Sequence, residues 1–199
     1  KENFVDIQLG DQVQKEMTVM FSDIRSFTEL SEDMTPKENF DFINHYLGYM
    51  EPVIRKNNGF IDKFIGDSIM ALFHEKVDNA LDAAIEMRHA LNMFNLDRID
   101  QGRPTIDSGI GIHTGNLMLG VVGGEGRMDG TVISDAVNLA SRLEGLSKIY
   151  RTSIIISEDT LIKLEEPSKY NFRFLDIARV KGKKEAVYVF EVLDGEPDE

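Results

Sequence analysis

The sequence predicts an α+β fold in which a mostly antiparallel sheet is covered by helices on one face. Two observations support this prediction: apolar runs come in pairs around Gly-containing turns, and longer segments with helical spacing of apolar residues lie between them. The chain has 199 residues, which suits one domain with a sizeable core. Its composition, 42% apolar and 29% charged, is that of an ordinary globular protein.

The first elements are a linker, a strand and a helix. Residues 1–16 are mixed and polar, and we expect them to be a linker or the end of an upstream region. Met17–Phe21 is a short apolar run typical of a buried strand. Thr35–Glu38 combines an N-cap, a Pro at the first helical position and a Glu two residues later, which predicts a helix start. Asn57–Gly59 should end this helix.

The middle of the chain predicts two hairpins and a second helix. Phe60–Ile65 and Ser68–Phe73 flank Gly66-Asp67, so a tight turn should join two strands there. Helical spacing of apolar residues follows from Val77 to Leu91. Alternating residues 106–113 and the apolar run 117–122 predict a second hairpin that turns at Thr114–Asn116.

The last third predicts a helix and three strands. The Gly-rich segment 123–127 lacks the Gly-Lys-Ser/Thr of a phosphate-binding P-loop and is expected to be a flexible connection. A third helix is expected from Ser134 to Leu146. Strands are expected at 153–157, 172–176 and 186–192, and residues 194–199 form an acidic tail.

Composition and charge exclude several classes of protein. With 22 Lys and Arg against 35 Asp and Glu, the net charge of −13 argues against a general nucleic-acid surface. The absence of Cys excludes disulfides and thiolate metal sites, and the four His show no ligand spacing. No apolar run is long enough to span a bilayer and no signal peptide is apparent, so we expect a cytoplasmic domain without membrane insertion. An anionic ligand would need local cations or bound metal ions.

Two acidic residues lie at the ends of predicted apolar strands. Asp23 follows the first strand, and Asp67 lies in the turn of the first hairpin. Carboxylates that converge at one sheet edge could hold one or two Mg²⁺ or Mn²⁺ ions. The alternative is that both are ordinary turn residues, where Asp is favoured.

Two further features are compatible with binding. Strict alternation places Lys63 on the same side of its strand as Ile61 and Ile65, where a lysine needs a partner unless its ammonium reaches water. Asn138 and Arg142 lie four residues apart on one face of the third helix. They could clamp a phosphate, or they could belong to a solvated helix face.

Four segments in order resemble the successive motifs of the class III nucleotidyl cyclase catalytic domain. They are Phe21–Thr28, Phe64–Ser68, Gly111–Gly115 and Ser134–Arg142. The resemblance extends over nearly the whole chain, and residues 17–193 would form the catalytic domain. It implies a ferredoxin-like core that dimerises head to tail, with composite active sites at the interface.

The resemblance assigns roles to individual residues. Asp23, Asp67 and the backbone carbonyl of Ile24 would hold two divalent metal ions, Mg²⁺ or Mn²⁺. Asn138 and Arg142 would come from the partner chain and act on the transition state. The base would be read by Lys63 and Thr131, with Val132 also at the substrate. Phosphates would be bound at Phe27, Thr28, Arg127 and Lys181, with Lys183 a competitor for the last role.

The implied function is a homodimeric adenylyl cyclase that converts ATP to 3′,5′-cyclic AMP and pyrophosphate. Adenine offers N1 as an acceptor and N6 as a donor, which suits the pair Lys63 and Thr131. This pair also resembles a bicarbonate-responsive subgroup, so regulation by bicarbonate is expected. The alternatives are a guanylyl cyclase, an inactive cyclase-like module that senses nucleotide, and a nucleotide-transfer domain of the polymerase-palm type.

Overall fold

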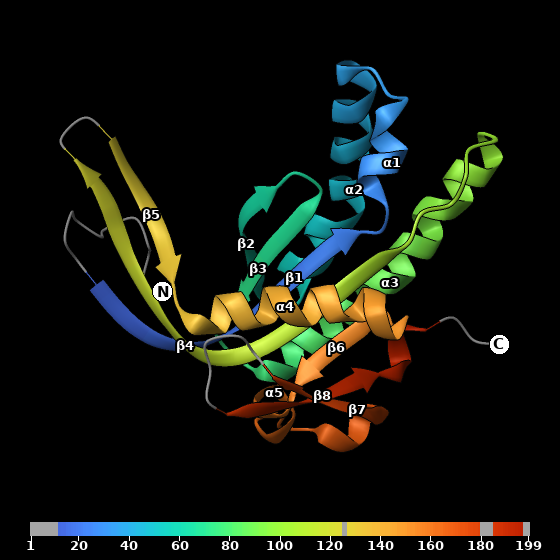
Figure 1. Cartoon of the computed structure of the whole chain (residues 1–199). Helices are drawn as coiled ribbons and strands as arrows, with labels where there is room; N and C mark the ends of the chain where they lie inside the picture. The colour runs from blue at the N-terminus through green and yellow to red at the C-terminus, as the bar shows by residue number, and fades with distance from the viewer. Residues whose placement is uncertain (1–11, 125–126, 180–184, 197–199) are drawn as a thin grey trace.

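A computed structural model describes residues 12–124, 127–179 and 185–196 of the chain (Figure 1). Its centre is an eight-stranded sheet in the order β2-β3-β1-β4-β6-β8-β7, with β5 paired to β4. Among the strands that the structure describes, only β4 and β6 pair in parallel and the other pairs are antiparallel, which confirms the predicted α+β class. The strands are β1 (Gln12–Ile24), β2 (Gly59–Ile65), β3 (Ser68–Phe73), β4 (Ser108–Gly124), β5 (Arg127–Ile133), β6 (Ile154–Ser157), β7 (Phe172–Arg179) and β8 (Ala186–Val192).

The helices begin where local signals place them. Before the second helix, the Thr35 hydroxyl accepts from the Glu38 backbone amide at 3.2 Å, and the Glu38 carboxylate accepts from the Thr35 amide at 2.8 Å. This capping box confirms the predicted start. The helices are α1 (Phe27–Glu32), α2 (Pro36–Lys56), α3 (Val77–Asp100), α4 (Asp135–Tyr150) and α5 (Glu158–Ile162), with 3₁₀ turns at Pro167–Lys169 and Leu193–Gly195.

Helices cover both faces of the sheet, so the predicted one-sided cover is wrong. Alternate residues of β1 belong to different buried clusters: Met20 packs in the cluster that contains residues of α2 and α3, and Val19 packs in the cluster that contains Ala136 and Ala140 of α4. Successive strand residues point to opposite faces. The long central strands are therefore buried on both sides, with α4 packed on one face and α2 and α3 on the other (Figure 1).

The second predicted hairpin does not exist. Residues 108–124 form one continuous strand, and Gly115 and Asn116 pair with Met17 and Glu16 of β1 instead of forming a turn. The pairing is possible because β1 begins at Gln12, inside the segment expected to be a linker. Gly115 serves close packing: a Cβ there would lie 3.1 Å from the Cβ of Ala136 in α4. The Gly-rich segment instead lies where β4 ends and the antiparallel β5 begins.

The sheet topology determines where polar strand ends meet. β1 lies between β3 and β4, and its register pairs Ser22 with Ile69 of β3. The C-terminal end of β1 therefore lies beside the turn that joins β2 to β3. Within the part of the chain that the structure describes, no helix is both long and apolar enough to cross a membrane.

Candidate active site

Asp23 and Asp67 meet at one edge of the sheet. Asp23 is the penultimate residue of β1, and Asp67 follows Gly66, whose φ of 63° forms the β2–β3 turn. The backbone amide of Ile24 donates to Asp67 Oδ2 at 3.0 Å, and the Ser68 hydroxyl donates to Asp23 Oδ1 at 3.1 Å. The two carboxylates therefore converge as the strand ends predict.

Their closeness perturbs both carboxyl groups. Burial, the hydrogen bond to Asp23 and the negative charge of Asp23 raise the pKa of Asp67 to about 7. Burial also acts to raise the pKa of Asp23, but hydrogen bonds with Asp67 and Ser68 and the charge of Lys148 hold it below its usual range. Near neutral pH the pair accordingly shares one proton, because two adjacent carboxylates resist double ionisation.

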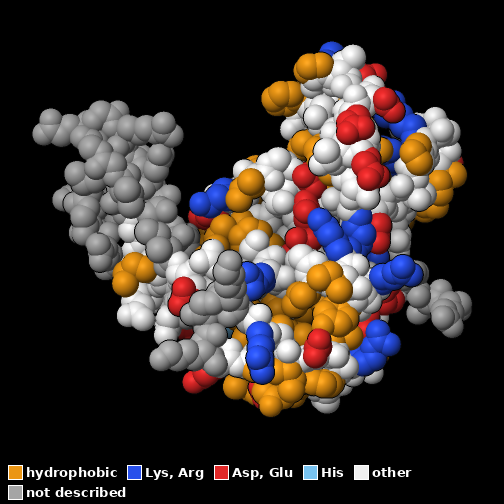
Figure 2. All heavy atoms as spheres, in the orientation of Figure 1, with side chains coloured by type: hydrophobic (Ala, Val, Ile, Leu, Met, Phe, Trp, Pro, Cys, Tyr) orange, Lys and Arg blue, Asp and Glu red, His pale blue; other side chains and the backbone are white. Residues whose placement is uncertain are grey.

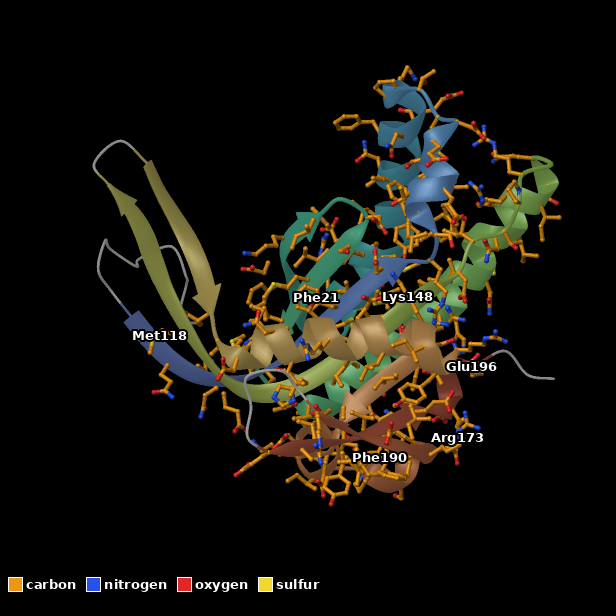
Figure 3. All side chains as sticks on the ribbon, viewed as in Figure 1. Phe21, Met118, Lys148, Arg173, Phe190 and Glu196 are labelled. Carbon is orange, nitrogen blue, oxygen red and sulfur yellow. The ribbon has the colours of Figure 1, made fainter. Side chains whose placement is uncertain are left out.

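Two residues of α4 reach the same place, and sequence reasoning missed both. Lys148 Nζ lies 3.4 Å from Asp23 Oδ2 and is labelled beside the end of β1 in Figure 3. Glu144 is buried, and its Oε1 has no hydrogen-bond partner among the described residues. Burial and then the charge of Asp23 raise the pKa of Glu144 to about 7. The sequence did offer a signal for Glu144, because an acidic residue beside Leu143 on the apolar face of a helix is unusual. It offered no comparable signal for Lys148.

The residues present fit a divalent cation. Hard cations prefer oxygen ligands, and a positive ion between Asp23 and Asp67 would replace the shared proton and relieve the repulsion that raises the pKa of Asp67. Among the described side chains no group of three or more His, Asp or Glu could hold a metal ion. The pair, with the carbonyl of Ile24, would thus leave coordination positions to phosphate oxygens and water, as is usual for Mg²⁺.

The first turn of α1 follows this pair directly. Phe27 and Thr28 are the first two residues of α1, and the preceding Ser26 has φ 54° and makes no side-chain cap. The first amides of a helix have no acceptor within the helix. The predicted phosphate-binding amides therefore lie in an uncapped helix start next to the carboxylates.

Lys63 lies on the opposite face of β2 from the one that strict alternation predicts. The register of β2 against β3 shifts after Ile61: Ile61 pairs with Ala71, but Lys63 pairs with Met70. Ala71 belongs to the cluster under α2 and α3, and Met70 to the cluster under α4. Lys63 thus shares the α4 face of the sheet, and its side chain is 43% exposed.

Asn138 and Arg142 are exposed on α4 and do not reach Asp23 or Asp67 of their own chain. Neither makes a hydrogen bond or ion pair with another described residue. Both line an open groove of about 780 Å³ together with Leu146, Ile149 and the end of β7. Ile149 is 74% exposed, and apolar side chains gather on the face that α4 crosses (Figure 2).

The remaining predicted residues are located only in part. The backbones of Arg127, Thr131 and Val132 lie in β5, where Thr131 pairs with Gly120 of β4. The structure describes this strand by its pairing alone, so the roles of these three side chains stay predictions. Lys181 and its competitor Lys183 lie outside the described residues.

Comparison with known proteins agrees with this geometry. Residues 9–192 match the model of the adenylate and guanylate cyclase catalytic domain family. The adenylate cyclase of Anabaena cylindrica is 47% identical over 193 residues, which are 94% of this chain and 38% of that protein. The terminal-differentiation specific adenylate cyclase of Dictyostelium discoideum is 41% identical over 98% of this chain and 9% of its own length. The chain therefore spans well under half of these two relatives.

Solved structures share the fold. The adenylyl cyclase CyaB from P. aeruginosa superimposes with a TM-score of 0.80 at 33% identity, covering 92% of this chain and 96% of that one. The guanylyl cyclase Cya2 superimposes with a TM-score of 0.77, also at 33% identity, covering 90% of this chain and 92% of that one. Similarity of the whole fold to these two structures therefore does not show whether the substrate is ATP or GTP.

Proposed function

The chain belongs to the family of adenylate and guanylate cyclase catalytic domains, and we propose that it converts ATP to 3′,5′-cyclic AMP and pyrophosphate. The observation that carries this proposal is the convergence of Asp23 and Asp67 at the end of β1. In the reaction the ribose 3′-oxygen forms a bond to the α-phosphorus, the bond from that phosphorus to the bridging oxygen breaks, and pyrophosphate leaves. The hydroxyl proton is lost to solvent.

Asp23, Asp67 and the carbonyl of Ile24 would hold two divalent ions, Mg²⁺ or Mn²⁺. When bound, these ions lower the pKa of the 3′-hydroxyl and neutralise phosphate charge. The uncapped amides of Phe27 and Thr28 would donate to the phosphates. Arg127 and Lys181 would add positive charge there, which an acidic chain of net charge −13 otherwise lacks.

The active site is proposed to be completed by a second copy of the chain. Asn138 and Arg142 are exposed and make no contact with the carboxylates among the described residues, so we infer that one chain holds two incomplete halves. In a head-to-tail dimer, Asn138 of the partner would orient the ribose. Arg142 of the partner would stabilise the charge that develops on the α-phosphate. The apolar groove around Leu146 and Ile149 supplies surface for such an interface.

Base selection is assigned to Lys63 and Thr131, with Val132 beside the substrate. The position of Lys63 on the α4 face supports this role, because α4 also carries Asn138 and Arg142. A lysine ammonium donates to adenine N1, whereas guanine presents an N1–H donor at the same place. The likeness to the guanylyl cyclase Cya2 makes GTP the competing substrate.

One assay tests the proposal and its competitor. Formation of cyclic AMP and cyclic GMP is measured from ATP and GTP, with Mg²⁺ and with Mn²⁺, on a protein that contains this domain. Cyclic AMP as the main product supports the proposal. Cyclic GMP as the main product would establish the guanylyl cyclase, and no turnover with either metal would establish an inactive nucleotide-sensing module.

Regulation by bicarbonate is part of the same proposal and rests on the Lys63 and Thr131 pair. Activity is compared in sodium bicarbonate and sodium chloride at equal ionic strength and clamped pH. A higher kcat in bicarbonate supports the assignment to the responsive subgroup, and equal rates would remove it without affecting the choice of ATP.

A further inference from the structure

Strand β2 contains one residue more than its partner strand β3. Before the extra residue, Phe60 pairs with Leu72 and Ile61 with Ala71; after it, Lys63 pairs with Met70. Asp62 is the residue without a register partner, so it forms a β-bulge. Bulges bend a strand locally and change the direction of the side chains that follow.

The bulge determines which face of the sheet carries Lys63. In an unbroken register Lys63 would lie opposite Ile69, which is buried in the cluster under α2 and α3. The extra residue places it opposite Met70 instead, on the face that α4 covers. If Asp62 instead paired with Met70 in an unbroken register, the ammonium would point toward an apolar core and away from the face of Asn138 and Arg142.

Asp62 also holds the ammonium directly. Lys63 Nζ lies 3.5 Å from Asp62 Oδ2, and the Asp62 side chain is only 18% exposed. No other ion pair of Lys63 occurs within the described ranges. An ammonium has three donors. The ammonium can therefore face a ligand while it stays beside the Asp62 carboxylate, and this ion pair limits the rotamers that a free lysine would populate.

From this geometry we infer that Asp62 is a positioning residue for nucleotide selection: its bulge turns Lys63 to the base side of the sheet, and its carboxylate holds the ammonium there. The inference rests on the proposed function, in which Lys63 reads adenine N1. Asp62 acts through Lys63 and does not itself touch substrate.

The test compares kcat and KM for ATP and GTP in three variants. Asp62→Asn keeps the bulge and removes the charge, Asp62→Glu keeps the charge, and Lys63→Met removes the group that reads the base. For Asp62→Asn we expect the ATP to GTP ratio of kcat/KM to fall about three- to fivefold, as suits a partly exposed ion pair. The fall should arise mainly from a higher KM for ATP, since base binding is equal in ground and transition states. Asp62→Glu keeps the charge and should therefore have a higher ATP to GTP ratio of kcat/KM than Asp62→Asn.

A matched control and a double variant separate positioning from general damage. Asp41→Asn removes a carboxylate that pairs with Lys37 on the exposed side of α2 and should leave the ratio unchanged. Asp62→Asn combined with Lys63→Met should be no less selective than Lys63→Met alone, because the two residues act in series. If Asp62→Asn lowers kcat/KM for ATP and for GTP by the same factor, Asp62 has a structural role only and the inference is overturned.

Failure of the inference and failure of the proposed function give different results. If Lys63→Met leaves the ratio unchanged, the base is read elsewhere and both are wrong. If Lys63→Met lowers the ratio but Asp62→Asn does not, Lys63 reads the base without help and only the inference is overturned.

Discussion

At the scale of single residues, electrostatic coupling joins Asp23, Asp67 and two residues of α4. Asp67 carries a pKa of about 7 because of burial and of Asp23, and Lys148 offsets part of the negative charge. Glu144, buried nearby, adds a third acid with a raised pKa. The metal-free protein thus holds protons where the proposed reaction requires cations.

Replacing Asp23 or Asp67 by Ala should abolish turnover and leave the fold intact. Both residues lie at strand ends outside the buried clusters, and removing either eliminates a cation ligand beside the phosphates. We expect cyclic AMP formation to fall roughly a hundredfold or more, as for other lost charge-stabilising groups. Circular dichroism checks folding. Near-normal activity in a folded variant would contradict the assignment of that residue.

The metal-free protein should lose stability as pH rises from about 4 to 7. Asp67 and Glu144 have ordinary pKa values of 3.8 and 4.5 and pKa values of about 7 in the fold. The folded state binds protons more tightly, so this stabilisation is fully present below about pH 4 and is lost as pH passes through 7. After solvent screening, about 1 kcal/mol is expected for Asp67, which corresponds to a fall in Tm of roughly 2–4 °C.

Thermal unfolding in EDTA at several pH values measures this effect. The difference in slope between the wild type and Asp67→Asn isolates the contribution of Asp67, and excess Mg²⁺ at pH 8 should restore stability to the wild type only. An identical pH dependence in the two proteins would contradict the raised pKa.

At the scale of elements, the site depends on how closely α4 packs on β4. At Gly111 of β4, an added Cβ would overlap the backbone nitrogen of Glu144 and lie 2.6 Å from the carbonyl oxygen of Ala140. These atoms belong to the helix backbone and cannot move singly. Because α4 carries Glu144 and Lys148 to Asp23, its distance from β4 also controls the charge around the carboxylates.

Gly111→Ala should therefore destabilise the protein by an amount at the upper end of the roughly 1–3 kcal/mol seen for overpacking. The matched control is Gly48→Ala in the exposed part of α2, where an added Cβ meets nothing within 4 Å. That change should stabilise by up to about 1 kcal/mol through helix propensity. Urea unfolding measures both, and equal stability of the two variants would contradict the close packing.

At the scale of the whole molecule, the two halves of the proposed site lie on one chain, and no contact joins them among the described residues. The carboxylates lie at the end of β1, whereas Asn138 and Arg142 line the open groove on α4. This arrangement is expected for a dimer with twofold symmetry, in which each chain would contribute its carboxylates to one site and its Asn138 and Arg142 to the other.

Mixing two inactive variants should restore activity. Asp23→Ala and Arg142→Ala are each expected to be inactive alone, because each loses one half of every site. In a heterodimer one interface collects both defects and the other is intact. Random pairing of equal amounts makes about half the dimers mixed, so activity should return to about a quarter of wild type. An inactive mixture, with subunit exchange shown by a labelled chain, would mean that each chain completes its own site.

Local sequence patterns were sufficient to predict the features that depend on a few neighbouring residues. Periodicity and the capping box at Thr35 predicted α2, and a Gly-Asp pair between apolar runs predicted the β2–β3 hairpin. The meeting of Asp23 and Asp67 was also predictable, since both end strands of one sheet. Binding of metal and nucleotide at these positions stays a prediction that rests on family membership.

Features that depend on partners distant in the chain became visible only in the folded structure. Pairing with the long β1 keeps β4 continuous through Gly115, where local signals predicted a turn. The bulge at Asp62 reverses the face of Lys63, because one extra residue inverts all later alternation. Lys148 reaches Asp23 only because α4 packs across the second face of the sheet. Strand register and helix packing minimise the free energy of the whole core, and no local pattern encodes that sum.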